Sequence, residues 1–416
     1  MDISPIRFPP SPRLPLEVMF LIFACLPPNN DWATLHACSL LSRQCLRQSR
    51  KILFAKISLR IRIDPKSKPV LIIHVSRRIQ GLCDMLQRDP ETARSVKALE
   101  LLDSYPVYNS DWIICNQNLP RFFKMLVGLR SLTFGCEIGY LQWPSLSPEL
   151  RGSLYMLLRM PHLESLDLRN IGTIPPHVLG THVRHLNLDS MTITLPYPLL
   201  VLSDALLPNT ALSTLNLRTI STPTSTSSWV VVLMHYRTVE SIKWRCWEGN
   251  SLPTLRPPSP HDYFTDPLMA DGISFTGTVD FGLLPRLKKL SIRMSYGKVG
   301  RDLIGLCKAL ESISRQSPLE ILELDILFPL QVAPDYTSEI HNHMFWSHLA
   351  ILLLRTEYCA LSRVRMDLTV HSRVTTREDR SYNSMTGFRK RMKESLRGML
   401  SNPTFRFNFR VQAFRL

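Results

Sequence analysis

The side chains best suited to metal chemistry are three histidines in the segment EIHNHMFWSH: His341, His343 and His348. A structural zinc site usually needs four ligands, commonly with cysteine among them. No cysteine lies at a suitable spacing, and on one helix His343 would point away from the other two. Three further histidines are scattered over an expected loop and strand start: His177, His182 and His185. We therefore expect no metal and no cofactor.

Nucleophilic catalysis has no motif in this sequence. Neither a GxSxG element nor a glycine-rich phosphate loop occurs. Cys25, Cys38 and Cys45 fall on expected core faces, and free cysteine is commonly buried. We predict no catalytic residue and expect that the protein is not an enzyme.

Composition sets the broad class of the protein. The 416 residues are 44% hydrophobic and 20% charged, which indicates a globular chain long enough for more than one domain. No apolar run reaches the roughly 20 residues of a membrane span, and the start MDISPIRFPPSPR lacks a secretory pattern. Nine cysteines without a CxxC pair suit a reducing compartment, the cytoplasm, the nucleus or both.

The formal net charge of +16 raises the question of nucleic-acid binding. Much of the excess lies late, because residues 361–416 hold 13 Lys or Arg against 4 Asp or Glu. No zinc-finger spacing accompanies it, and no interleaving of aromatic and basic residues of the kind found in RNA-binding modules. We expect a basic tail and a solvated face, and we keep nucleic acid only as a disfavoured partner.

The stretch from 13 to 60 predicts three short helices that would position any N-terminal site. Leu14-Pro15 opens the first, since proline is tolerated at an early helical position. The segment Pro27–Asn30 ends that helix, and Leu35 begins the apolar stripe of the second. A third helix is expected from about 44 to 54.

This stretch resembles an F-box over roughly the first 60 residues. The family pattern begins with Leu-Pro-x-Glu, here Leu14, Pro15 and Glu17, and continues with Ile and Leu four residues apart, here Ile22 and Leu26. A Leu then precedes a Cys-Ser-Leu-Val-Cys-Arg segment, and these positions are Leu35 and the run from Cys38 to Arg43. Leu53-Phe54 matches the usual end. The chain departs from the family at Leu41-Ser42, which replaces Val-Cys, and at Cys45, which replaces Trp.

The resemblance implies that the module docks on a Skp-type adaptor and through it on a cullin of a ubiquitin ligase. The rest of the chain would then hold an unknown substrate protein, without membrane contact. The expected adaptor-binding residues are Leu14, Pro15, Leu16, Glu17, Ile22, Leu26, Leu35, Ser39, Leu40, Leu41 and Arg43. The alternative is a three-helix cap that seals the repeats without engaging a ligase.

From residue 96 onward a Leu-x-x-Leu-x-Leu pattern recurs, as in LESLDL at 163 and LSTLNL at 212. Starts are separated by 33, 34, 20, 29, 27, 48, 32 and 42 residues. Each motif alternates as a half-buried strand does, and helical stretches lie between the motifs. We predict a mixed α/β chain, with an F-box followed by an irregular leucine-rich-repeat solenoid of short parallel strands and helices. An ordinary α/β domain with a parallel sheet is the alternative.

The expected organisation follows from these patterns. Residues 1–12 form a disordered leader, 13–60 the F-box, 61–95 a connecting strand and helix, 96–400 the repeats and 401–416 a basic C-terminal segment. A strand is expected at 57–63 and a helix at 70–89. Long loops are expected at 219–228 and 250–277.

Alternation also predicts which repeat residues face a concave surface. If Leu166 and Leu168 point inward, their neighbours point to the opposite face, with basic residues grouped in its middle. The expected substrate-binding residues are Asp167, Arg169, Asn187, Asp189, Asn216, Arg218, Lys243, Arg245, Arg293, Glu323, Asp325 and Arg365, with Ser291 and Asp367 beside them. Such a surface favours a partner with an acidic patch.

Overall fold

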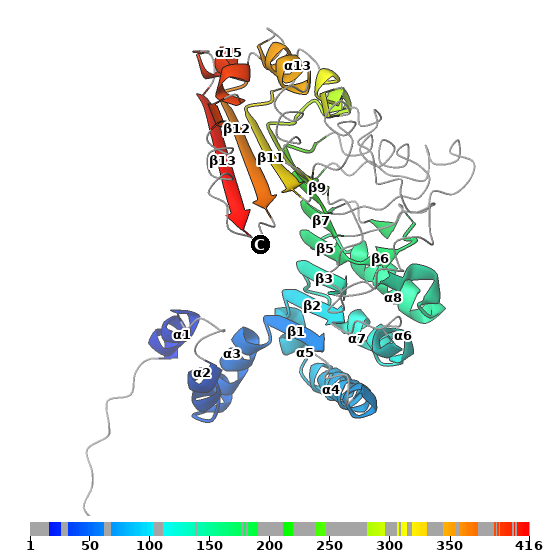
Figure 1. Ribbon diagram of the computed structural model, residues 1–416. Coiled ribbons are helices and arrows are strands. Elements are labelled where there is room, and N and C mark those ends of the chain that lie inside the picture. The colour runs from blue at the N-terminus through cyan, green and yellow to red at the C-terminus, as the bar shows by residue number, and fades with distance from the viewer. Residues whose placement is uncertain are drawn as a thin grey trace, which may run out of the picture.

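The computed structural model describes a curved parallel sheet with helices along its outer side (Figure 1). It describes residues 16–25, 32–61, 68–103, 111–137, 140–175, 178–179, 182–189, 211–218, 238–246, 281–295, 306–307, 309–313, 318–330, 344–354, 358, 360–372, 387, 389–390, 392–401, 403 and 406–415. The expected leader at 1–12 and the expected loops at 219–228 and 250–277 lie outside these residues.

The main sheet has eleven described strands that follow one another in chain order, every neighbouring pair parallel. The strands are β1 (Lys56–Ile61), β2 (Ala98–Asp103), β3 (Ser131–Cys136), β5 (Ser165–Arg169), β7 (His185–Asp189), β8 (Thr214–Arg218), β9 (Ser241–Cys246), β10 (Lys289–Ser295), β11 (Ile321–Leu330), β12 (Arg363–Ser372) and β13 (Arg406–Arg415). A doubly wound α/β sheet reverses its strand order at a switch point, and this sheet does not. The prediction of a mixed α/β chain with parallel strands is confirmed, and the order is that of a solenoid.

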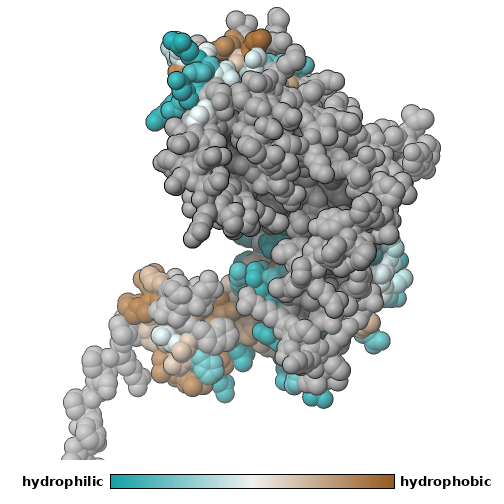
Figure 2. Space-filling view, in the orientation of Figure 1, coloured by the Kyte–Doolittle hydropathy of each residue, from teal (hydrophilic) through white to brown (hydrophobic). Residues whose placement is uncertain are grey.

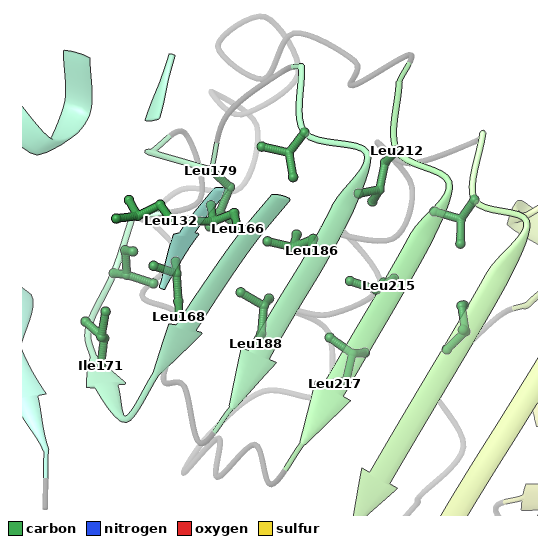
Figure 3. Packing of buried hydrophobic residues seen from close by; sticks show 14 of the residues in the cluster. Leu132, Leu166, Leu168, Ile171, Leu179, Leu186, Leu188, Leu212, Leu215 and Leu217 are labelled. Carbon is green, nitrogen blue, oxygen red and sulfur yellow. The ribbon is translucent and has the colours of Figure 1, made fainter. Parts of the chain in front are cut away.

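The strand register explains why leucine recurs in the motifs. Leu132, Leu166, Leu186 and Leu215 are Cα partners on successive strands, and all are buried. Figure 3 shows them side by side on one face of the sheet, with Leu168, Leu188 and Leu217 forming the next row. The apolar faces of successive strands belong to one hydrophobic cluster, so the core is one continuous column.

Helices and short connections cover the outer side of the sheet. They are α4 (Lys68–Arg88), α5 (Pro90–Ser95), α6 (Asp111–Cys115), α7 (Leu119–Met125), α8 (Pro148–Leu158), α13 (Met344–Leu353) and α15 (Arg397–Leu400), with 3-10 turns η2 (Trp143–Ser145) and η6 (Phe281–Leu283). A small parallel pair, β4 (Leu141–Gln142) and β6 (Ile171–Gly172), lies among them. The helix expected at 70–89 is confirmed by α4, whose Ile79 and Leu86 are buried. No helix in the described residues is long and apolar enough to span a membrane.

Three helices precede the first strand, as the sequence predicted: α1 (Leu16–Cys25), α2 (Trp32–Ser39) and α3 (Arg43–Leu53). Ser42, one of the two positions that depart from the F-box pattern, is the N-cap of α3 because its Oγ accepts a hydrogen bond from the Cys45 backbone N–H at 3.1 Å. Cys45, the other departure, is buried. Both substitutions therefore have a structural role in this module.

The C-terminal segment differs from the sequence expectation. We expected only a basic tail at 401–416, yet Arg406–Arg415 form β13, which pairs with β12 over ten residues. Its apolar alternation is carried by Phe407, Phe409 and Val411 instead of leucine, so the leucine motif did not detect it. The strand expected at 57–63 is present as β1, which begins one residue earlier at Lys56, and residues 62 and 63 lie outside the described residues.

Candidate protein-interaction surfaces

The three N-terminal helices expose a group of large apolar side chains. Leu40 is 77% exposed and Leu41 is 66% exposed, in the turn between α2 and α3. On α1, Leu21 is 67% exposed and Ile22 is 47% exposed, with Val18 also on the surface. Figure 2 shows hydrophobic side chains gathered over these helices. We call these five residues the apolar patch.

Local hydrogen bonds fix the turn that presents Leu40 and Leu41. The Leu40 backbone N–H donates to the Ala37 carbonyl at 3.1 Å, and the Leu41 N–H donates to the Cys38 carbonyl at 3.1 Å. The Ser42 cap follows directly and starts α3. The two leucines therefore project from a turn whose backbone N–H groups are already paired.

Apart from Leu35, the expected adaptor-binding residues divide into four groups. Ile22, Leu40, Leu41 and Arg43 are exposed. Ser39 is half-buried, and its hydroxyl donates to the His36 carbonyl at 2.6 Å. Leu16 and Glu17 belong to α1 by their backbone, whereas three expected contacts lie outside the described residues: Leu14, Pro15 and Leu26.

Leu35 requires a correction. It was expected to contact the adaptor, but its side chain is 0% exposed and belongs to the core of the helical module. An apolar stripe identifies a buried face without saying what covers it, and here the neighbouring helices cover it. Conversely, the F-box pattern did not predict Val18 and Leu21. Val18 lies three residues before Leu21 and four before Ile22, so it neighbours both side chains on the surface of α1.

The inner face of the sheet, opposite the helices, carries two rows of polar residues in strand register. The first row runs through Glu100, Thr133, Asp167, Asn187, Asn216, Lys243, Ser291, Glu323 and Arg365. The second row runs through Arg169, Asp189, Arg218, Arg245, Arg293, Asp325 and Asp367. All the expected substrate-binding residues therefore occupy successive positions in these rows, Arg218 and Arg245 by their backbone alone.

At the N-terminal end of the inner face, Glu100 is nearly buried and joins two strands. It accepts hydrogen bonds from Arg60 Nε at 2.9 Å and from Ser58 Oγ at 3.0 Å. Arg60 also lies 3.4 Å from Glu137. Burial raises the pKa of Glu100, but the hydrogen bonds from Arg60 and Ser58 outweigh it, so the pKa is lowered overall. Sequence analysis did not single out Glu100, although it occupies the same motif position as Asp167.

Further along, Asp167 is held by two neighbours. Arg169 donates to its Oδ2 from Nε at 3.0 Å and from Nη2 at 2.6 Å, while Asn187 Nδ2 donates to Oδ1 at 2.6 Å. The hydrogen bond with Asp167 raises the pKa of Arg169. Both oxygens of the carboxylate are therefore engaged, and the two rows are connected within and between strands.

A hollow opens in the inner face across β9 to β12. Its lining residues are Lys243, Ser291, Arg293, Glu323, Leu324, Asp325, Arg365 and Asp367. Lys289 Nζ lies 3.0 Å from Glu323, Arg293 Nε lies 3.1 Å from Asp325, and Arg365 Nη2 lies 2.5 Å from Asp367. The acidic groups of the hollow are thus each paired with a cation. This is a surface suited to polar recognition.

The groups considered for chemistry are placed as follows. Cys307 is buried, and desolvation raises the pKa of its thiol to about 12, which keeps it protonated. His348 Nε2 lies 2.7 Å from Glu311 Oε1, whereas His341 and His343 lie outside the described residues. No group of three His, Cys, Asp or Glu residues in the described part of the chain could hold a metal ion.

Comparison with known proteins does not assign a family. No family model matches this chain, and no curated protein matches it. The two surfaces are therefore interpreted from their own residues.

Proposed function

We propose that this chain is the substrate-recognition subunit of a Skp–cullin–F-box ubiquitin ligase. The helical module of α1 to α3 docks on a Skp-type adaptor, and through it on a cullin. The inner face of the sheet binds the target protein. The observation that carries this proposal is the apolar patch on a small helical module at the start of a long sheet. The residue pattern of the F-box supports it, because Leu40 matches that pattern and Leu41 occupies its Val position.

Exposure of these side chains has an energetic meaning. Burying a leucine side chain contributes roughly 1.5–3 kcal/mol, so Leu40 and Leu41 together could contribute several times the thermal energy on docking. Large apolar side chains exposed on a small module commonly mark an interaction site. The helical module therefore has a driving force for binding a partner that covers α1 and the turn between α2 and α3.

The inner face supports the second half of the proposal. Basic residues occupy neighbouring positions on β8 to β10, at Arg218, Lys243, Arg245 and Arg293. Complementary charge determines partner choice and association rate more than affinity, which favours a target with an acidic patch. The chain does no chemistry in this proposal. It holds target lysines near an activated ubiquitin carried by other subunits, and so contributes proximity.

Co-purification with a Skp-type adaptor tests the proposal. The wild-type chain should form a stoichiometric complex, and the double variant Leu40→Ala, Leu41→Ala should lose it. Met156→Ala is the matched control, because Met156 is 67% exposed on the distant helix α8. Retention of the complex by the double variant, or absence of a complex with the folded wild type, would contradict adaptor docking through this patch.

A second candidate function is a non-catalytic leucine-rich scaffold whose helical module only caps the sheet. Contacts between the module and the first repeat favour it. Arg50 lies 3.7 Å from Asp89, and Lys51 lies 3.5 Å from Glu91. The Ala55 carbonyl accepts from two backbone N–H groups at the start of β2. Terminal repeats need such covering. A folded wild-type chain that binds no adaptor would select this candidate.

A further inference from the structure

The sheet ends at β13 within the part of the chain that the structure describes. This strand is ten residues long and has β12 as its only strand neighbour there. A long strand at the edge of a sheet presents backbone donors and acceptors to any extended segment that approaches. The question is which groups of β13 face outward.

The hydrogen bonds of the neighbouring residues answer it. The Arg406 N–H donates to the Ser362 carbonyl at 2.9 Å, so the Arg406 backbone faces β12. Because the register with β12 is regular, the direction alternates, and Phe407 and Phe409 direct their backbone groups to the outer edge. Arg389 Nη2 donates to the Val411 carbonyl at 2.8 Å, which is the outward direction expected for Val411.

Side chains on the two faces of β13 add specificity. Phe407 and Phe409 are half-buried, and their rings stack with centroids 6.3 Å apart. Arg406 and Arg410 are exposed on the inner face, four residues apart. An added strand would therefore meet aromatic surface on one face and two guanidinium groups on the other.

Charge selects among the possible occupants. Pairing with a second copy of β13 would bring arginine-rich strands together, and like charges across a strand pair are destabilising. An extended segment with alternating acidic and apolar residues avoids this repulsion. We propose that β13 accepts such an acidic segment of a partner protein as an additional strand, paired at Phe407 and Phe409. This site is separate from the helical module and does not depend on adaptor docking.

Three peptides test the proposal on the full-length protein. The probe is a fluorescent peptide of about ten residues, the length of β13, in which glutamate alternates with valine. The second peptide replaces glutamate by lysine, and the third keeps glutamate but carries N-methyl groups on alternate amides. Fluorescence anisotropy should detect binding of the first peptide. Binding of the other two should be at least about tenfold weaker, because one lacks the charge and the other cannot form the ladder.

Variants assign the binding to β13. The double reversal Arg406→Glu, Arg410→Glu should exchange the preference, so that the lysine peptide binds and the glutamate peptide does not. Arg184→Glu, Arg286→Glu changes the net charge equally at exposed arginines away from β13 and should leave the preference unchanged. Hydrogen exchange should show slowing at the amides of Phe407 and Phe409 in the bound state, with little change at Asn408.

Several outcomes would overturn the proposal. These are no binding of the glutamate peptide, equal binding of its N-methylated form, or a preference unaffected by the double reversal. A wild-type dimer in sedimentation that Phe409→Pro disperses would assign the edge to a second copy instead. If the arginines instead protect the edge against any pairing, hydrogen exchange at the Phe407 and Phe409 amides would not slow, and this would also overturn the proposal.

Discussion

Arg60 on β1 donates its guanidinium hydrogen bonds to Glu100 on β2, across the first pair of strands and 40 residues away in sequence. Glu100 is nearly buried, so this contact joins the start of the repeats where the helical module meets them. Each group stabilises the charged form of the other. The pair therefore makes the stability of this end of the sheet depend on pH.

Replacing Glu100 by Gln should lower the free energy of unfolding by roughly 1.5–3 kcal/mol at pH 7, the range for hydrogen bonds to charged groups. The pKa of Glu100 is lower in the folded than in the unfolded chain, so its stabilising contribution is present above the unfolded value of about 4.3. It is lost as the pH falls through the folded value. Urea unfolding across this range should show the difference from wild type shrinking toward acid. Glu394→Gln, at an exposed position, is the matched control variant.

Replacement by alanine should have opposite effects at Leu35 and at the pair Leu40 and Leu41. Loss of Leu35 should lower stability, whereas loss of Leu40 and Leu41 should abolish adaptor binding. Leu35→Ala removes a fully buried side chain and should cost about 2–5 kcal/mol in the unfolding of the helical module. Leu40→Ala, Leu41→Ala changes exposed side chains and should alter stability by only about 0.5 kcal/mol each. Hydrogen exchange of the α2 and α3 amides measures the stability change in both variants. A large loss of protection in the double variant would mean that the apolar patch is part of the module's core.

Two glycines offer a matched test of the backbone. Gly135 in β3 has φ of 137°, and a Cβ there would lie 1.9 Å from the Arg169 carbonyl oxygen. Gly135→Ala should therefore be destabilising by more than about 1 kcal/mol. A Cβ at Gly152 in α8 would meet nothing within 4 Å, so Gly152→Ala should stabilise by about 0.5–1 kcal/mol. Thermal unfolding of the two variants should shift in opposite directions, and a shared direction would contradict the described geometry.

Thiol reactivity should separate buried from exposed cysteines. Desolvation raises the pKa of Cys307 to about 12, so at pH 8 its thiol is protonated as well as covered. Cys115 and Cys25 are exposed. Iodoacetamide labelling of the native protein, read by mass spectrometry, should modify these two cysteines long before Cys307. Labelling in urea should remove the difference, and early modification of Cys307 in the native state would contradict its burial.

Local pattern was sufficient for much of the fold. The alternation in LESLDL identified a strand because Leu166 and Leu168 must face one side, and the same rule located the strands that follow. It failed at β13, where Phe407 and Phe409 replace leucine, although the period of two is unchanged. A search for apolar alternation regardless of residue type would have found this strand.

The candidate surfaces were harder to predict, because exposure depends on tertiary packing. Leu35 and Leu40 both matched the F-box pattern, yet one is buried and the other is largely exposed. A sequence stripe cannot distinguish a face covered by a neighbouring helix from one left open. The contact between Arg60 and Glu100 likewise needs the register of two strands, which no local window contains.

The strand register makes the distance between polar side chains on the inner face independent of the length of the connections between strands. From Leu166 to Leu186 the chain uses 20 residues, and from Ile242 to Leu290 it uses 48, yet each step advances by a single strand. Adjacent strands lie about 4.8 Å apart whatever joins them. Insertions between strands can therefore accumulate without changing the distances between polar side chains along a row. The inner face keeps a constant pitch, and the connections are free to diverge in length.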